Sequence, residues 1–180
     1  MAQKKITTLQ NLRVAFDELK AINPLLELES RNIDNVDFNV YKNAPKTFRD
    51  LYDLIQLLHG DFPFINENNV QQSFSEIIQQ SKNLAFYLHE QGIKPGDSVG
   101  ICMQNCTNWI IVFLAITGHG ATCVPFNSWW TAKELEYGIK HSDVKTLFVD
   151  KKRYENVSNL NVKIITNEKI EGEIYLNDTL

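Results

Sequence analysis

The segment from residue 97 to residue 150 constrains the fold of this chain most, because short apolar runs alternate in it with helix-like runs. Alternation of this kind is typical of a parallel sheet whose strands are joined by crossover helices. Three runs have the length and apolar content of buried strands: 99–103, 121–126 and 145–149. The sequence therefore predicts an α/β fold with a mostly parallel sheet and helices on both of its faces.

A short apolar helix is expected between the first two of these strands. It covers about residues 109–117, and a side-chain oxygen of Thr107 or Asn108 can cap its first turn. Gly118 and Gly120 end it, because glycine accepts the left-handed conformation that closes a helix. The helix is apolar on nearly every side and far shorter than the about 20 residues that span a bilayer, which predicts a helix buried all round.

Two capping boxes predict where two other helices begin. In a capping box, a Ser or Thr hydroxyl accepts the N–H of the residue three positions later, whose carboxylate accepts the N–H of the first. Ser73 and Glu76 open a helix that ends at Gly92, and Thr131 and Glu134 open a helix that precedes the third strand.

The first sixty residues are interpreted as a helical and extended lead-in. Residues 6–20 have apolar side chains at helical spacing, and residues 36–40 alternate weakly, as an extended arm would. Thr47 caps a second helix that ends at Gly60, and a hairpin is expected within residues 62–73. We therefore divide the chain into a lead-in at 1–60, an α/β subdomain at 61–166 and a polar, irregular end at 167–180.

Charge and composition exclude several classes of function. The net charge of −4 argues against nucleic acid as a main partner, because phosphate binding needs a basic surface. The first residues carry charge without an apolar core behind it, so no secretory signal and no transmembrane segment are expected. Three cysteines, an odd number, suit a reducing compartment better than a disulfide framework, and we expect a cytoplasmic protein.

A metal or redox site has little support in the sequence. Cys102, Cys106 and Cys123 could form a metal site together with His119 and His141, but no Cys-x-x-Cys pair supports it. We interpret the three thiols as scattered and buried. Cys106 lies just before a helix N-terminus, and this position predicts some thiolate character for its side chain. No acid or base partner can be assigned to Cys106, so we do not interpret it as a nucleophile.

Two short motifs also have plain structural interpretations. Residues 118–120 form a Gly-x-Gly that precedes a strand, whereas a dinucleotide-binding loop follows a strand and opens a helix. We interpret this motif as a helix end. The basic run Lys151-Lys152-Arg153 is interpreted as the solvated start of a helix.

Several segments resemble the AMP-forming acyl-CoA synthetases, which are adenylate-forming enzymes. Residues 116–127, ITGHGATCVPFN, are similar to the family's helix, small-residue loop and strand ending in Val-Pro-Leu-Asn, although His119 replaces a small residue. Residues 93–97 match the family's Val-x-x-Gly-Asp turn, and residues 73–77 are a conservative variant of Thr-Tyr-x-Glu-Leu. Residues 129–135 look most like the fatty-acyl branch. The resemblance covers most of the chain but only the opening part of the family's large domain.

The resemblance implies a ligase that acts on a fatty acid. In the whole enzyme, ATP and Mg²⁺ would convert the acid to an acyl-adenylate, and coenzyme A would then displace AMP. The family's Ser/Thr/Gly-rich phosphate loop and its catalytic lysine are not in this sequence. We therefore assign no catalytic, cofactor-binding or metal-binding residue, and expect a truncated fragment that binds no cofactor and is inactive alone. By resemblance, residues 167–180 begin the linker to a nucleotide-binding part.

Trp129 and Trp130 are the candidate interface residues. Packing of their loop against the sheet edge is one interpretation. The other is a contact surface for the rest of the synthetase or for a second subunit, because tryptophans often anchor interfaces. A stand-alone α/β protein-interaction module without catalysis is the alternative to a ligase fragment.

Overall fold

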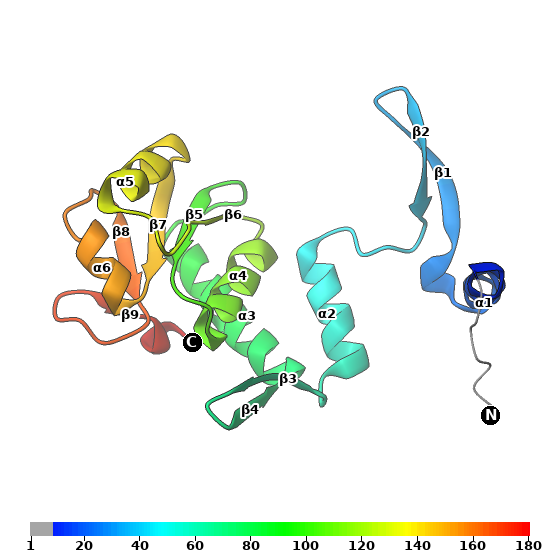
Figure 1. The fold of residues 1–180 in the computed structure, drawn as a ribbon, viewed down its shortest axis with the longest axis horizontal. Helices are drawn as coiled ribbons and strands as arrows, with labels where there is room; N and C mark the ends of the chain where they lie inside the picture. Colours follow the sequence, from blue (N-terminus) through cyan, green and yellow to red (C-terminus); the bar gives the residue numbers. More distant parts are fainter. Residues whose placement is uncertain (1–8) are drawn as a thin grey trace. The chain divides into compact units, whose positions relative to one another are not determined.

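The structure is a computed structural model that describes residues 9–180, and the chain divides into two compact units between Lys46 and Thr47 (Figure 1). Residues 6–8 of the first predicted helix lie outside the described residues. The second unit begins before residue 61, where we expected the subdomain to begin, because the second helix packs onto the helices that cover the sheet.

The first unit consists of a helix and a hairpin. Helix α1 (Leu9–Ile22) is followed by a 3₁₀ turn, η1 (Pro24–Leu26), and by the antiparallel strands β1 (Leu28–Ile33) and β2 (Val36–Tyr41). Asp34 and Asn35 both have positive φ angles, 51° and 66°, as a two-residue hairpin turn of type I′ requires. The predicted extended arm at 36–40 is thus one strand of a hairpin, and the sequence reasoning missed its partner β1.

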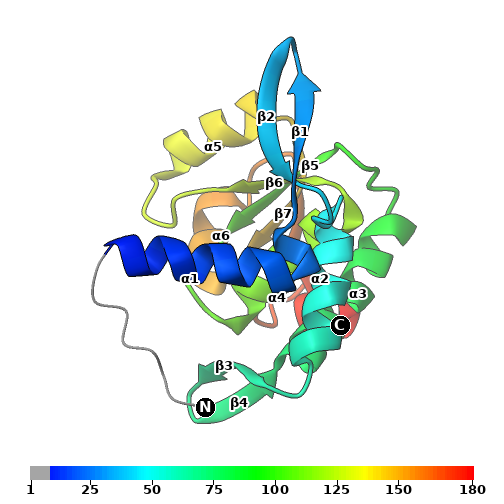
Figure 2. The same cartoon turned by 90° about the vertical axis from the view of Figure 1, so that its right-hand side faces the viewer.

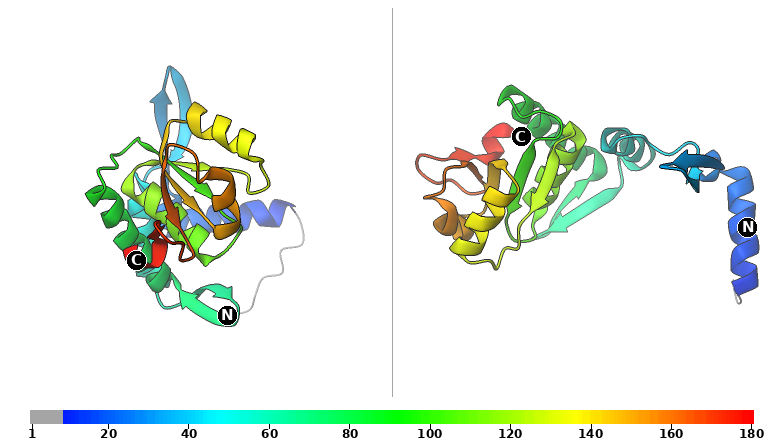
Figure 3. Two further views of the ribbon diagram at one scale, coloured as in Figure 1. Left: turned by 90° about the vertical axis from the view of Figure 1, so that its left-hand side faces the viewer. Right: turned by 90° about the horizontal axis from the view of Figure 1, so that it is seen from above.

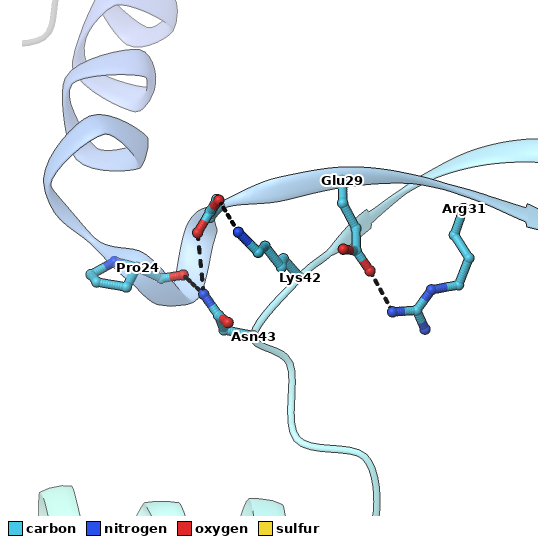
Figure 4. A network of polar contacts seen from close by, with 6 residues as sticks. Pro24, Glu29, Arg31, Lys42 and Asn43 are labelled. Atoms are coloured by element: carbon cyan, nitrogen blue, oxygen red, sulfur yellow. Dashed lines mark hydrogen bonds and ion pairs between the residues drawn. The ribbon is translucent and has the colours of Figure 1, made fainter.

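Polar contacts hold the base of this hairpin, and Figure 4 shows them from close by. The Nζ atom of Lys42 lies 2.6 Å from Oε1 of Glu27, and Nδ2 of Asn43 donates to the carbonyl oxygen of Pro24 at 2.8 Å. Arg31 pairs with Glu29 along β1. No residue of α1, β1 or β2 is buried, so these exposed pairs and the main-chain ladder order the unit in place of an apolar core.

The second unit is built on a five-stranded parallel sheet, which confirms the predicted fold class. The strand order is β6-β5-β7-β8-β9. Ile101 of β5 is level with Phe148 of β7, and Phe148 is level with Ile165 of β8. The strands are β5 (Ser98–Cys102), β6 (Thr122–Pro125), β7 (Val144–Val149), β8 (Lys163–Thr166) and β9 (Ile174–Tyr175).

Helices cover both faces of this sheet (Figure 1, Figure 3). One face packs against α3 (Phe74–Glu90) and α4 (Thr107–His119), and the other against α5 (Ala132–His141) and α6 (Lys151–Val157). Successive strand side chains point to opposite faces. Hence Ile101 and Phe148 belong to the core under α3 and α4. Their neighbours Cys102, Leu147 and Val149 belong to the core under α5 and α6.

A helix and a hairpin precede the sheet. Helix α2 (Phe48–His59) runs beside α3 (Figure 2), and Nζ of Lys82 lies 2.9 Å from Oδ1 of Asp53 across the two helices. The predicted hairpin is confirmed as β3 (Pro63–Glu67) and β4 (Val70–Ser73), and its turn residues Asn68 and Asn69 have positive φ angles.

Both predicted capping boxes are present, and the structure adds one that the sequence reasoning did not identify as a box. Ser73 and Glu76 exchange hydrogen bonds of 3.2 and 2.7 Å at the start of α3. Thr131 and Glu134 do the same at the start of α5. The third box joins Thr47 to Asp50 at the start of α2.

Helix α4 begins and ends differently from the prediction. Its N-cap is Cys106 without a side-chain cap, and the N–H of Thr107 donates to Oε2 of Glu67 at 3.1 Å. A carboxylate from the β3–β4 hairpin therefore replaces the expected Thr107 or Asn108 cap. The helix continues through Gly118 to His119, and only Gly120, with φ 92°, forms the left-handed end.

The end of the chain is more ordered than its polar sequence predicted. Within residues 167–180 lie the short strand β9 and a 3₁₀ helix, η2 (Leu176–Thr179), and Leu176 is fully buried in the core under α3 and α4. None of the helices described between residues 9 and 180 has both the length and the apolar character that crossing a membrane demands.

Candidate functional site at the carboxyl edge of the sheet

Three loops meet at the carboxyl edge of the parallel sheet, where open α/β sheets bind ligands. They follow β5, β6 and β7, which are neighbours in the sheet. The second of these loops carries the two tryptophans singled out in the sequence, and the third carries Asp150. This edge is therefore the candidate functional site.

A buried ion pair lies at the centre of this edge. Asp150 directly follows β7 and is 4% exposed, and Arg153, in the first turn of α6, is 7% exposed. The Nη1 atom of Arg153 donates to Oδ2 of Asp150 at 3.1 Å. Oδ1 of Asp150 also accepts the main-chain N–H of Arg153 at 2.9 Å, so the same carboxylate caps the helix.

The pair joins the three loops to one another. The N–H of Gln104, after β5, donates to Oδ2 of Asp150 at 2.9 Å. Nε of Arg153 donates to the carbonyl oxygen of Ser128, after β6, at 3.0 Å. Burying two charges is favourable only where additional hydrogen bonds satisfy them, and these contacts do so. We call Gln104, Ser128, Asp150 and Arg153 the strand-end clamp.

The sequence reasoning missed this clamp. It treated Lys151, Lys152 and Arg153 as a solvated helix start, and this is wrong for Arg153, since its side chain turns back over the sheet edge. Lys151 and Lys152 are exposed as expected. An Asp at the end of an apolar strand with an Arg three positions later was the signal available, because this spacing brings the two side chains together on the first helical turn.

The two tryptophans have different surroundings. Trp129 is 82% exposed, and Nζ of Lys152 lies 5.9 Å from the centre of its ring. Trp130 is half-buried and packs against Phe126, with 6.1 Å between ring centroids. A Cβ atom at Gly138 of α5 would lie 2.9 Å from the ring of Phe126 and 3.0 Å from the ring of Trp130, so a side chain there would force these rings to shift. One tryptophan is thus part of the packing and the other is presented to solvent.

Asn167 follows β8 at the same edge. Its N–H donates to the carbonyl oxygen of Val149 at 3.0 Å and extends the ladder beyond β8. Its side-chain Oδ1 is buried and has no hydrogen-bond partner in the described part of the chain. A buried acceptor without a donor is costly, so this oxygen is available to a donor that the described residues do not supply.

The cysteines at and near this edge are not activated. Burial raises the pKa of Cys102 and that of Cys123 to about 11. Burial also raises the pKa of Cys106, so the expected thiolate character of Cys106 is wrong. Among residues 9–180, no three His, Cys, Asp or Glu side chains gather into a group that could hold a metal ion.

The side chains at this edge hold the three loops in place and present a surface to solvent. The charges of the strand-end clamp neutralise each other and are buried, while the indole of Trp129 and the ammonium group of Lys152 face solvent. Such an arrangement suits contact with another protein surface better than proton transfer or nucleophilic attack.

The comparisons with known proteins agree on one family. The profile of the family described as "AMP-binding enzyme" matches residues 57–178. Acyl-CoA ligase sidI of Beauveria bassiana (strain ARSEF 2860) is 34% identical over 108 residues, which cover 59% of this chain and 19% of that protein. Long chain acyl-CoA synthetase 5 of Arabidopsis thaliana is 34% identical over 84 residues, which cover 47% of this chain and 13% of that protein.

Solved structures share the fold. The anthranilate CoA ligase AuaEII, whose crystal structure holds anthranoyl-AMP, matches with a TM-score of 0.70 and 17% sequence identity over 76% of this chain and 28% of that one. The alignments cover less than a fifth of the length of each of the two curated relatives.

Proposed function

Because this chain belongs to the family of AMP-binding enzymes, as the N-terminal part of an adenylate-forming acyl-CoA synthetase, we propose that the whole protein is an ATP-dependent fatty-acid CoA ligase. The family match over residues 57–178 carries this proposal. In the proposed reaction, the carboxylate of the acid attacks the α-phosphorus of ATP, which gives an acyl-adenylate and releases pyrophosphate. The thiol of coenzyme A then displaces AMP and forms the thioester.

The proposed acid is a fatty acid. Residues 129–135, WWTAKEL, resemble the fatty-acyl branch of the family, and a long chain acyl-CoA synthetase is among the relatives. In the whole enzyme, pyrophosphate release with acids of increasing chain length tests this point. A preference for a short or aromatic acid over every fatty acid would contradict it.

ATP, Mg²⁺ and coenzyme A are the proposed ligands of the whole enzyme, but the residues of this part do not fit the first two. In sites of this kind, magnesium is held by one or two carboxylates together with the phosphates of the bound nucleotide, so its site depends on a phosphate-binding loop. The sequence has only eight glycines and no run of Ser, Thr and Gly that could surround a triphosphate with N–H groups. We therefore propose that the remaining part of the synthetase supplies both binding sites.

The proposal also states that this part alone is inactive. Purified chain, incubated with ATP, Mg²⁺, coenzyme A and dodecanoate, should release no pyrophosphate above a buffer control. Release that depends on both ATP and the acid would contradict it.

The proposed role of this part is to support the rest of the synthetase. In this proposal, residues 167–180 lead into the nucleotide-binding part, and Trp129, held by the strand-end clamp, contacts that part. The exposure of Trp129 and the unpaired Oδ1 of Asn167 at the same edge support the proposal.

A binding experiment tests this contact. Trp129→Ala should weaken association with a separately expressed downstream part at least about tenfold, as expected for an aromatic anchor. Leu57→Ala is the matched control, because Leu57 is 81% exposed but lies on α2. Equal effects of the two changes would argue against a contact at Trp129.

The cytoplasm is the proposed location. All three cysteines are free thiols, which supports a reducing compartment. Fractionation of cells expressing the whole protein checks this, and recovery from a secreted fraction would contradict it.

A further inference from the structure

A cavity elsewhere in the second unit has the shape of a ligand-binding site. This cavity, of about 650 Å³, lies between α2, α3 and α4. Pro95, just before β5, and Gly118 and His119, just before β6, are among its lining residues, which places it toward the amino ends of the strands. The cavity is therefore distinct from the strand-end clamp, which lies at the carboxyl edge.

The interior of this cavity is mostly apolar. Its walls include Ile78 and Ala85 of α3 and Leu114 of α4, and the ring of Phe86, 67% exposed, also lines it. The hydroxyl of Tyr52 is already hydrogen-bonded to Oγ1 of Thr117 at 2.7 Å, so that hydroxyl is engaged within the protein. The volume is within the range of about 300–1,000 Å³ that is usual for small-molecule sites.

Among the described residues, the guanidinium group of Arg49 is a cation of the lining that has no counter-charge. Lys82 and Asp53 both line the cavity, but they pair with each other at 2.9 Å. Arg49 donates from Nε to the carbonyl oxygen of Gly118 at 3.3 Å, which anchors its guanidinium group at the cavity. Within the described chain, no carboxylate lies within ion-pair distance of Arg49, and its two Nη groups make no hydrogen bond.

These features together select one class of ligand. An apolar wall favours a hydrophobic body, and a planar guanidinium group recognises a carboxylate with two parallel hydrogen bonds. A dianion would need a second free lysine or arginine, and Lys82, the only lysine of the lining, is already paired with Asp53. The two histidines of the lining, His89 and His119, lie with their rings 6.1 Å apart, and Nε2 of His119 is hydrogen-bonded to the carbonyl oxygen of Ile93.

We propose that the cavity between α2, α3 and α4 binds a small amphiphilic monocarboxylate, whose carboxylate pairs with Arg49 and whose apolar body lies against Ala85 and Leu114. This site is additional to the proposed ligase reaction and does not depend on it. It lies toward the amino ends of the strands, apart from the strand-end clamp, and the proposal includes binding only.

Isothermal titration calorimetry with 2-naphthoate tests the charge contact, and neutral 2-naphthamide serves as the isosteric probe. Arg49→Gln should weaken naphthoate binding about tenfold, since a charge-assisted pair is lost, and should leave naphthamide binding unchanged. The matched control is Arg13→Gln, because Arg13 is an exposed arginine of α1 in the other unit. Neither probe should respond to that control.

A cavity-filling variant tests the location. Ala85→Phe should abolish binding of both probes, whereas Leu57→Phe, on the exposed side of α2, should not. Circular dichroism checks that each variant is folded, and if Ala85→Phe does not fold, the Arg49→Gln comparison decides alone. The proposal is overturned if naphthoate shows no saturable binding, if Arg49→Gln and Arg13→Gln have equal effects, or if folded Ala85→Phe still binds.

Discussion

Replacing Arg153 by methionine is predicted to destabilise the second unit strongly, although Arg153 lies in a basic run that the sequence marks as surface. Methionine has a similar length and keeps the main-chain N–H that donates to Asp150. The change removes the ion pair of 3.1 Å with Asp150 and the hydrogen bond of 3.0 Å to Ser128. It therefore leaves a carboxylate that is 4% exposed without its counter-charge.

The size of the effect follows from these contacts. Removing one partner of a buried ion pair costs about 3–5 kcal/mol. Asp150 retains two main-chain donors in Arg153→Met, the N–H groups of Gln104 and of residue 153, and these compensate part of its charge. We therefore expect the free energy of unfolding to fall by about 3 kcal/mol, the lower end of that range.

Urea unfolding followed by tryptophan fluorescence is the assay. Trp109, Trp129 and Trp130 are the only tryptophans in the sequence, and all three lie in the unit Thr47–Leu180, so the signal reports on that unit. The double variant Asp150→Asn with Arg153→Met should be more stable than Arg153→Met alone, because a neutral amide leaves no buried charge.

The control is an exposed ion pair in the same unit. Nζ of Lys140 lies 2.6 Å from Oε1 of Glu136, and the two side chains are 74% and 44% exposed. Lys140→Met should cause no measurable loss, because water already solvates both of these charges. The reasoning would be refuted if Arg153→Met lowered the free energy of unfolding by less than about 1 kcal/mol, the value typical of an exposed pair.

Three further predictions concern the core, the capping boxes and the thiols. Leu84→Ala, which removes a fully buried side chain of α3, should lower the free energy of unfolding by about 3 kcal/mol, whereas Leu57→Ala at an exposed position should not, as urea unfolding will show. The N–H of Ser73 holds the pKa of Glu76 below its ordinary value of 4.5, so this carboxylate stabilises the fold above that pH and its contribution is lost as pH falls through the lowered pKa. Glu76→Gln should therefore flatten the fall in Tm below about pH 4.5, and an unchanged slope would contradict this. Cys102, with a pKa of about 11, should react with iodoacetamide at pH 8 far more slowly in the folded chain than in urea, as mass spectrometry of the labelled peptide will show.

Periodicity and local capping chemistry predicted most of the sheet and its helices. The apolar runs correspond to β5, β6 and β7, and the face of α3 with Ile77, Leu84 and Leu88 is fully buried. These features depend on interactions between residues that are close in the sequence, so they can be predicted from a single sequence. The Trp129–Trp130 pair was also found from sequence, but its role as an interface remains a prediction.

Other features could not be predicted, because they depend on contacts between residues that are far apart in the sequence. Glu67 of the β3–β4 hairpin reaches the N-terminus of α4, so no rule based on the residues around Thr107 could find this partner. Helix α2 shows the same limit, because the apolar residues along it do not all lie in the core. Phe48 and Leu58 are more than half exposed, and Tyr52 is the buried residue, because its hydroxyl bonds to Thr117 of α4.

The strand-end clamp shows the same limit at the candidate site. The sequence places Asp150 at the end of a strand, but it does not indicate that Arg153 lies across the loop after β6. Only the parallel order of β6, β5 and β7 brings Ser128, Gln104 and Asp150 to one point. The order of strands in a sheet depends on long-range packing that periodicity does not encode.

The coding sequence downstream of the codon for Leu180 provides the most direct test of the central proposal, that this chain is the opening part of an AMP-forming ligase. We predict that it encodes, in frame or after a disrupted stop codon, a Ser/Thr/Gly-rich loop that contains a lysine. If no such loop follows, the ligase proposal is contradicted, and a stand-alone α/β module that binds a protein partner at Trp129 becomes the better account.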